Sequence, residues 1–142
     1  MEKECPFCEI NREKTRVIWE GDKVFVVLSN PRLMKGHTLV IPKRHVGKIS
    51  ELNAEEQKEL FEVVLNFQER ILGKISKGCD IVQNYRPFQK EGRLKVYHLH
   101  VHLRPRELFD ELYEKSQIHE TGIFRELDEN EKDEVAGLLS KE

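Results

Sequence analysis

The chain has 142 residues, a length typical of one domain with its own hydrophobic core. Charged residues make up 35% of it, but acidic and basic residues are interspersed and the net charge is only −2, so it lacks the basic field of a nucleic-acid-binding protein. No apolar run reaches membrane-spanning length, and no secretory signal precedes the first predicted strand. The odd count of three cysteines argues against a disulfide framework, so we expect a cytoplasmic protein. From its charge and hydropathy we expect neither a membrane nor a specific nucleic-acid partner.

Two cysteines, Cys5 and Cys8, form a Cys-x-x-Cys pair near the N-terminus. Without a βαβ unit around it, such a pair is more typical of a metal knuckle than of a redox dithiol. A single knuckle supplies two thiolates, whereas structural zinc takes four ligands. From these residues alone, a metal site and a chance pair both stay open.

Three strands are predicted in the first third of the chain. Residues 17–20 and 23–28 are rich in β-branched and aromatic side chains and flank the turn signal Gly21-Asp22, so they predict a β-hairpin. A third strand is predicted within residues 36–45 and is closed by Pro42.

A long helix is predicted over residues 50–74. Asn53 and Glu56 have the spacing of a capping pair, and Gly73 and Gly78 end the helix. Its apolar stripe is interpreted as core packing, with a central row and a flanking row of side chains. The central row is Leu60, Val64, Phe67 and Ile71, and the flanking row is Phe61, Leu65 and Leu72.

A fourth strand is predicted over residues 79–84 and is followed by a basic loop over residues 85–95. The loop contains four basic residues against the single acid Glu91: Arg86, Lys90, Arg93 and Lys95. Such a loop is either a solvated surface segment or a binding site for phosphate, which arginine and lysine both bind well.

Residues 96–103 alternate histidine with apolar side chains. In a strand, alternate residues point to opposite faces, so His98, His100 and His102 share one face while apolar residues pack on the core. An imidazole can act as a base, a nucleophile or a metal ligand near neutral pH. The plain alternative is an edge strand with a polar face, but such faces normally vary their residues. Pro105 should end this strand, and helices are predicted over residues 107–119 and 129–139.

The run His98-Leu99-His100-Val101-His102-Leu103-Arg104 resembles the signature of the histidine-triad (HIT) family, His-φ-His-φ-His-φ-φ with φ apolar, and departs from it only at Arg104. A second run, Gly36 to His45, is similar to the family's Gly-His-x-Leu-φ-Ile-Pro-Lys-x-His pattern. The resemblance spans roughly residues 5–106 and implies an α+β fold, with an antiparallel sheet of about five strands and one long helix. Residues 107–142 would then be a C-terminal helical extension packed on the same domain. The resemblance also implies a homodimer.

Resemblance to the nucleotide hydrolase branch of this family implies cleavage at the α-phosphate of a purine nucleotide conjugate, either an adenosine phosphoramidate or a dinucleoside polyphosphate. His100 would be the nucleophile and form a nucleotidyl-histidine, His102 would donate to a phosphate oxygen, and His37 would support the triad. A transferase branch has glutamine where this chain has His102, so we disfavour it. No organic cofactor is implied.

The resemblance also places nucleotide-binding residues. Asn30, or Ser29 by strict counting from His37, would contact the ribose, and Asn84 the α-phosphate. Family members have a Gly-Gln-Ser or Gly-Gln-Thr loop before the triad, where this chain reads Arg93-Leu94-Lys95. Lys95 and Gln89 would replace the missing phosphate contacts. The loss of the Gln-Ser pair favours an alternative, a nucleotide-binding module with little or no turnover.

For the metal, the resemblance implies a structural zinc bound by Cys5, Cys8, His45 and His98, the closed Cys₂His₂ composition of structural sites. A rival hypothesis is a metal hydrolase in which all three triad histidines bind a catalytic zinc. That arrangement would leave the Cys-x-x-Cys pair and His45 unexplained.

Overall fold

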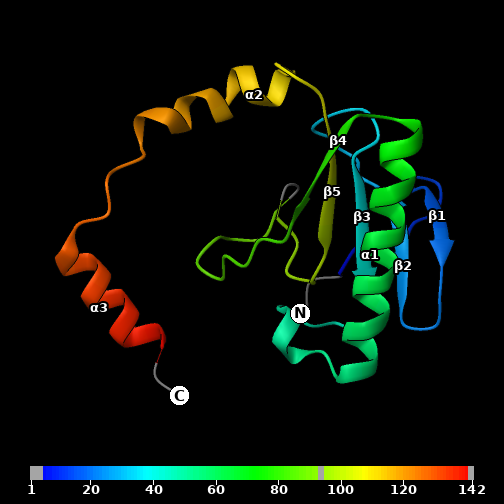
Figure 1. Ribbon diagram of the computed structural model, residues 1–142. Helices are drawn as coiled ribbons and strands as arrows, with labels where there is room; N and C mark the ends of the chain where they lie inside the picture. Colours follow the sequence, from blue (N-terminus) through cyan, green and yellow to red (C-terminus); the bar gives the residue numbers. More distant parts are fainter. Residues whose placement is uncertain (1–4, 93–94, 141–142) are drawn as a thin grey trace. The chain divides into compact units, whose positions relative to one another are not determined.

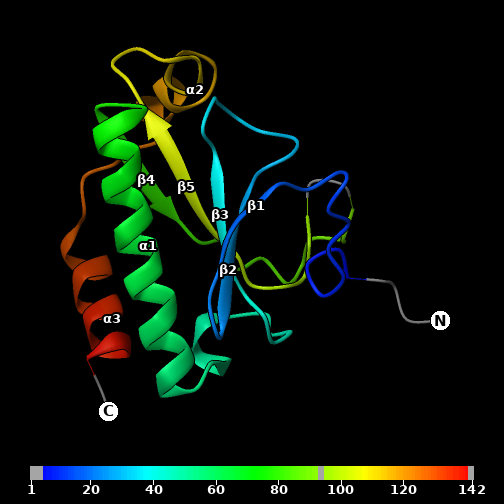
Figure 2. The ribbon, with the colours of Figure 1, turned by 90° about the vertical axis from the view of Figure 1, so that its right-hand side faces the viewer.

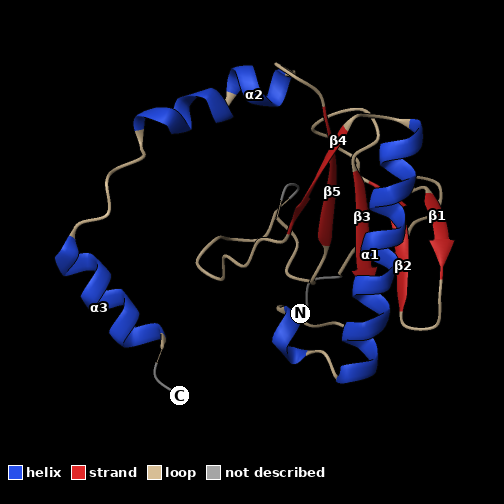
Figure 3. Cartoon of the chain, in the orientation of Figure 1, coloured by secondary structure: helices blue, strands red, loops and turns tan. Residues whose placement is uncertain are grey.

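A computed structural model describes residues 5–92 and 95–140 of the chain (Figure 1). Its contacts divide the chain into two units, Met1–Asp110 and Glu111–Glu142. The first unit contains a five-stranded antiparallel sheet in the order β1-β2-β3-β5-β4, together with one long helix (Figure 3). This confirms the predicted α+β architecture. The strands are β1 (Val17–Glu20), β2 (Val24–Leu28), β3 (Thr38–Pro42), β4 (Gly78–Val82) and β5 (Val101–Arg106).

The hairpin of β1 and β2 forms where the sequence predicts it, with Glu20 paired to Phe25. Its turn is closed by Gly21, whose backbone N–H donates to the Val24 carbonyl at 2.8 Å. A Cβ atom at Gly21 would overlap the ring of Trp19, so only glycine allows this close approach.

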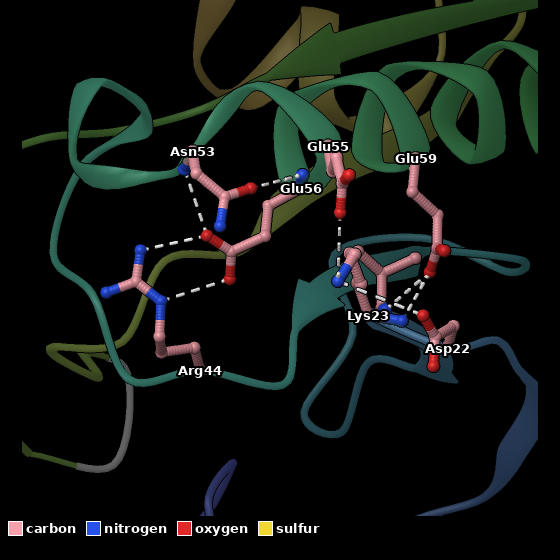
Figure 4. A network of polar contacts seen from close by, with 8 residues as sticks. Asp22, Lys23, Arg44, Asn53, Glu55, Glu56 and Glu59 are labelled. Atoms are coloured by element: carbon pink, nitrogen blue, oxygen red, sulfur yellow. Dashed lines mark hydrogen bonds and ion pairs between the residues drawn. The ribbon is translucent and has the colours of Figure 1, made fainter.

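The long helix α1 spans Ala54–Lys74 and follows a short 3₁₀ turn, Ile49–Glu51, so it begins later than the predicted Ser50. The capping pair is confirmed. The Asn53 side chain accepts from the Glu56 N–H at 2.9 Å, and the Glu56 carboxylate accepts from the Asn53 N–H at 2.9 Å (Figure 4). The helix continues through Gly73 because the Ile75 N–H still reaches the Ile71 carbonyl.

Helix α1 covers one face of the sheet (Figures 1 and 2), and the main core lies between them. The flanking row of the predicted stripe is wrong: Phe61, Leu65 and Leu72 are 48%, 56% and 37% exposed. Each follows a buried residue by one position, which is about 100° around a helix, so these side chains turn away from the sheet. The buried residues of the helix are Glu56, Leu60, Val63, Val64, Phe67 and Ile71.

On the opposite face of the sheet, a second apolar cluster is covered by the N-terminal segment (Figure 2). Phe7, Ile10 and Val17 pack there against buried side chains of β2 and β3: Phe25, Val27, Leu39 and Ile41. The Cys-x-x-Cys segment therefore lies against the sheet face that α1 leaves open.

Strand β5 differs from its prediction at both ends. It begins only at Val101, because the Leu99 N–H donates to the Val46 carbonyl, beyond the end of β3, instead of joining the ladder. It also continues through Pro105. Pairing between β3 and β5 stops at Leu103, so Pro105 has a strand partner, Cys79 of β4, on one side only. A position paired on one side tolerates a residue without an N–H.

The second unit contains α2 (Glu111–Lys115), a 3₁₀ helix (Gln117–Gly122) and α3 (Glu129–Leu139). The predicted helix over residues 129–139 is confirmed, with Asp128 as its N-cap. The predicted helix over residues 107–119 is wrong in its bounds, since α2 begins only at Glu111, ends at Lys115 and is followed by the 3₁₀ helix. The domain boundary after residue 106 and the packing of the extension on the first unit stay predictions. In the described part of the chain, no helix has the length and apolar character needed to cross a bilayer.

Candidate active site and metal centre

Four side chains from three separate segments converge on one point. The ligand atoms of Cys5, Cys8, His45 and His98 all lie within 4.8 Å of one another. The His98 Nδ1 lies 3.3 Å from the Cys5 Sγ, 3.5 Å from the Cys8 Sγ and 3.1 Å from the His45 Nδ1. The structure therefore brings together the whole predicted metal-binding set.

The spacing of these atoms fits a tetrahedral metal. Zn–N bonds of about 2.0 Å and Zn–S bonds of about 2.3 Å place ligand atoms roughly 3.3 to 3.8 Å apart. Burial, the hydrogen bond to Cys5 and the charge of Cys5 raise the pKa of the Cys8 thiol to about 11. Two thiolates so close together need a cation between them, and the donor set of two sulfurs and two imidazoles is the one zinc prefers.

Each ligand is held by its own local structure. The Cys5 carbonyl accepts from the Cys8 and Glu9 N–H groups at 3.1 Å, which closes the knuckle. His98 is buried, and its Nε2–H donates to the Pro42 carbonyl at 2.7 Å, which leaves Nδ1 free for a metal. His45 follows Arg44, whose guanidinium binds Glu56 at 2.8 and 3.1 Å at the start of α1 (Figure 4).

His100 is not among the clustered metal ligands, and its ring bonds to the backbone instead. Its Nδ1–H donates to the His98 carbonyl at 2.7 Å, so the lone pair of its neutral ring lies on Nε2. The ring lies 5.0 Å from that of His102, centroid to centroid. This geometry gives a neutral imidazole with a nucleophilic nitrogen and a second imidazole at its side.

His37 and His102 form a hydrogen-bonded pair. The Leu33 N–H donates to the His37 Nδ1 at 3.1 Å, so the proton of neutral His37 is on Nε2. That proton reaches the His102 Nδ1 over 2.9 Å. His102 therefore keeps its own proton on Nε2, where it can be donated to an anion.

These three histidines are neutral at pH 7. Burial, with the charges of Arg104 and His100, lowers the pKa of His37 to about 4. Burial and the same kind of repulsion lower the pKa of His102 to about 3. The pKa of His100 is also lowered, by burial and by the charge of Lys95. Neutral rings are required for a nucleophile and for the donor chain just described.

The two ribose candidates lie next to His37. The Ser29 N–H donates to the His37 carbonyl at 2.9 Å, and the Ser29 hydroxyl donates to the Pro31 carbonyl at 2.9 Å. Asn30 is exposed, and no hydrogen bond ties its side chain to another described residue. Asn30 is thus the one with a free amide, whereas the Ser29 hydroxyl is already engaged.

The three residues predicted to bind phosphate differ in their contacts. Asn84 follows β4 and accepts from the Arg86 guanidinium at 3.5 Å. The Lys95 ammonium donates to the Arg86 carbonyl at 2.9 Å and acts electrostatically on His100. Gln89 is exposed, and its described contact is a backbone turn to Arg86. Arg93 and Leu94 lie outside the described residues.

Two further residues belong to this region and were not predicted from sequence. Phe7, between the two cysteines, meets the His100 ring edge-on at 5.2 Å and the His98 ring at 5.9 Å. Arg104 follows His102 on the same face of β5 and lowers the pKa values of His37 and His102. The only sequence signal for Arg104 was its departure from an apolar position, and Phe7 gave none.

Comparisons with known proteins show the family to which the chain is similar. A sequence model of the HIT domain matches residues 11–108. An uncharacterized HIT-like protein of Methanocaldococcus jannaschii is 37% identical over 109 residues, which cover 72% of this chain and 78% of that protein. A protein of Schizosaccharomyces pombe named adenosine 5'-monophosphoramidase is 35% identical over 75 residues, 51% of this chain and 50% of that one. The crystal structure of a HIT family protein from Bacillus anthracis aligns with a TM-score of 0.70 and 24% identity, covering 99% of this chain and 97% of that one.

Proposed function

Because the chain belongs to the HIT family, we propose that it is a nucleotide hydrolase that cleaves at the α-phosphate of a purine nucleotide conjugate through a nucleotidyl-histidine intermediate on His100. One observation carries the proposal. The 2.7 Å hydrogen bond from the His100 Nδ1–H to the His98 carbonyl leaves the Nε2 lone pair free for attack.

The reaction has two displacement steps. In the first, the His100 Nε2 attacks the α-phosphorus, an N–P bond forms, and the bond to the leaving group breaks with its electron pair. A phosphate leaving group departs as the anion, and an amine departs with a proton taken from solvent. In the second, water attacks the same phosphorus, the N–P bond breaks, and the nucleoside monophosphate departs while the water proton goes to solvent. Throughout, the Nδ1–H donates to the His98 carbonyl, which stabilises the charge that the ring gains when its Nε2 is substituted.

His102 and His37 stabilise the phosphate from the side. The His102 Nε2–H donates to a non-bridging oxygen of the α-phosphate, and His37 keeps that proton in place through the 2.9 Å hydrogen bond. Because all these donors are fixed before substrate binds, little reorganisation is needed as negative charge shifts in the transition state.

Neighbouring side chains hold the nucleotide. Asn30 or Ser29 binds the ribose hydroxyls beside His37, and Asn84 binds the α-phosphate beyond β4. Lys95, whose charge acts on His100, supplies phosphate contacts in place of neutral donors, with Gln89 as a further donor from the same loop.

The substrate class is an adenosine phosphoramidate or a dinucleoside polyphosphate. The Schizosaccharomyces pombe relative, 35% identical over 75 residues, is named for the first of these activities. Attack by His100 is the same for both classes, since only the leaving group differs.

One structural Zn²⁺ would be held by Cys5, Cys8, His45 and His98, and it would cross-link the N-terminal segment to the end of β3 and to the triad. The rival three-histidine zinc is disfavoured, because the Nδ1 atoms of His98 and His100 face different partners, a metal cluster and a backbone carbonyl.

The test is AMP release from adenosine 5′-phosphoramidate and from diadenosine polyphosphates by the wild type, by His100→Ala and by a control, His119→Ala. His119 is exposed in the second unit and should be neutral to activity. We expect a loss of at least about 1000-fold in kcat for His100→Ala. Mass spectrometry should find the adenylyl group on the peptide that contains His100.

Two results would contradict the proposed hydrolase. A folded, zinc-loaded wild type that binds AMP but hydrolyses neither substrate class would replace this proposal with the nucleotide-binding module. Equal turnover by wild type and His100→Ala would reject the covalent mechanism.

We also propose that the protein is a cytoplasmic homodimer. Among the described residues, strand β4 pairs only with β5, and its Ile81 is 44% exposed. The neighbouring helix α1 exposes Phe61 and Leu65. Exposed apolar groups beside a free strand edge favour edge-to-edge pairing of two copies. Light scattering of the full chain should give twice the 16.8 kDa chain mass, and a monomer at micromolar concentration would reject the dimer.

A further inference from the structure

Arg104 carries a guanidinium that no described residue satisfies. It stands two positions after His102 in β5, where exposure alternates, so it continues the face of His100 and His102. Among the described residues, its Nε is the one buried side-chain nitrogen or oxygen without a hydrogen-bond partner. A buried donor left unpaired is costly, so a ligand is the expected explanation.

The carboxylates near Arg104 form their hydrogen bonds with another arginine, Arg106. Asp80 stands directly opposite Arg104 in the β4–β5 ladder, yet its carboxylate accepts from the Arg106 guanidinium at 2.7 Å. Asp110 also binds Arg106, at 2.7 and 3.0 Å. Both carboxylates therefore form their hydrogen bonds with Arg106, and Arg104 keeps only the electrostatic attraction of Asp80.

This leaves excess positive charge beside neutral histidines. Arg104 acts electrostatically on His37 and His102, Arg86 acts on Arg104, and Lys95 acts on His100. A guanidinium stays protonated even where burial and like charges disfavour it. An anion bound at this end of the face would be attracted by all three cations.

We propose that Arg104 forms a second anion subsite that binds a phosphate of the leaving group, so that the protein prefers nucleotides whose α-phosphate is joined to a further phosphate chain over phosphoramidates with an amine leaving group. This rests on the proposed function, because the α-phosphate is placed at His100 and His102. Same-face residues of a strand are about 7 Å apart, which puts the Arg104 guanidinium within reach of the next phosphate along. Arginine binds phosphate oxygens bidentately, which suits this position.

The first arm of the test measures binding and needs no turnover. AMP and ADP are titrated calorimetrically into zinc-loaded protein carrying His100→Ala, with Arg104 intact or changed to leucine, the residue class of the family signature. With Arg104 we expect ADP to bind at least about 10-fold more tightly than AMP, the range of a hydrogen bond to a charged group. In Arg104→Leu the two affinities should agree within about threefold, with AMP unchanged. Arg104→Lys should retain part of the preference.

The second arm measures hydrolysis by protein in which His100 is intact. Arg104→Leu should lower kcat/KM for a diadenosine polyphosphate by about 10- to 100-fold and change that for adenosine 5′-phosphoramidate by less than about threefold. The matched control is Arg125→Leu, an arginine of the second unit whose guanidinium contacts backbone carbonyls only. Its melting temperature and zinc content, and those of Arg104→Leu, are compared with the wild type.

Two other binding outcomes overturn the inference. Equal weakening of AMP and ADP would mean that Arg104 binds the α-phosphate itself. No change in either would mean that its partner is another protein group, such as an acid from a second copy. A preference for ADP that depends on Arg104, in a protein that releases no AMP from any substrate, would uphold the subsite and reject the hydrolase.

Discussion

His37 and His102, 65 residues apart in sequence, share a hydrogen bond of 2.9 Å between Nε2 and Nδ1. This bond decides which nitrogen of His102 carries the proton. His37→Ala leaves the His102 Nδ1 without a donor, and we expect kcat to fall about 10- to 100-fold with little change in KM. His37→Gln keeps an amide donor at this position and should recover part of the loss. The tautomer of His102, read by nitrogen-15 NMR, should change in the alanine variant, and an unchanged tautomer would contradict the relay.

The pH dependence of activity follows from the same pair. Burial lowers the pKa of His37 to about 4, that of His102 to about 3 and that of the nucleophile His100 below its usual value. The acid limb of kcat/KM should therefore have its midpoint below the ordinary imidazole value of about 6.5. The unfolded chain binds these protons first, so the contribution of the pair to stability is complete above about pH 6.5 and declines as pH falls toward 4. Rate profiles between pH 3 and 8 test this. An acid limb centred at 6.5 would show that the rings are solvated.

Removal of the metal should lower stability. Cys5→Ser deletes one of the four clustered ligands, so we expect less than 0.2 zinc per chain, as an order-of-magnitude figure, and a drop in melting temperature of roughly 5 °C or more. The matched control is Cys79→Ser, since Cys79 is a free cysteine outside the cluster. It should bind zinc as the wild type does. If Cys5→Ser kept its metal and its activity, the catalytic three-histidine zinc would return as the better hypothesis.

Phe7 links the metal knuckle to the nucleophile. Its ring meets His100 edge-on at 5.2 Å while its neighbours Cys5 and Cys8 belong to the metal cluster. Phe7→Ala removes this support, so we expect kcat to fall several-fold while zinc content stays unchanged. Phe7→Tyr keeps the ring and serves as the conservative control. The NMR line width of the His100 ring signals should increase only in Phe7→Ala. An equal loss of kcat in both variants would contradict a positioning role.

The sequence predicts the histidine face because it depends on local spacing, whereas the four-ligand metal set follows only from the resemblance to the family. It does not predict the proton positions, since these are fixed by distant carbonyls: Pro42 for His98, and the backbone of His98 for His100. Nor does helical periodicity indicate how wide a face the sheet will cover, which is why Phe61 and Leu65 were wrongly placed in the core.

The same limit applies to β5. The rule that proline ends a strand fails at Pro105, because the rule depends on how many strands flank that position, and this is a property of the whole sheet. Sequence spacing likewise cannot show that Asp80 and Asp110 accept hydrogen bonds from Arg106 while the Nε of Arg104 has no partner among the described residues.

The ion pair of Arg44 and Glu56 connects the segment of His45 to the start of α1 (Figure 4). Glu56 is 6% exposed, and its hydrogen bonds from Arg44 and the Asn53 N–H lower its pKa. Its contribution to stability is therefore present above the unfolded pKa of about 4.3 and is lost as pH falls through the lower folded value. Glu56→Gln should cost about 1–2 kcal/mol at pH 7 in urea unfolding, with the difference from wild type vanishing in acid.

The neighbouring Glu55 offers the matched control. Its carboxylate lies 3.7 Å from the Lys23 ammonium and is 82% exposed. Solvent screens such a pair, so Glu55→Gln should cost less than about 0.5 kcal/mol at the same pH. Equal costs for the two variants would mean that the buried position of Glu56 adds nothing. If Glu56→Gln alone also weakens zinc binding, the pair stabilises the metal centre as well as the helix, because Arg44 directly precedes the ligand His45.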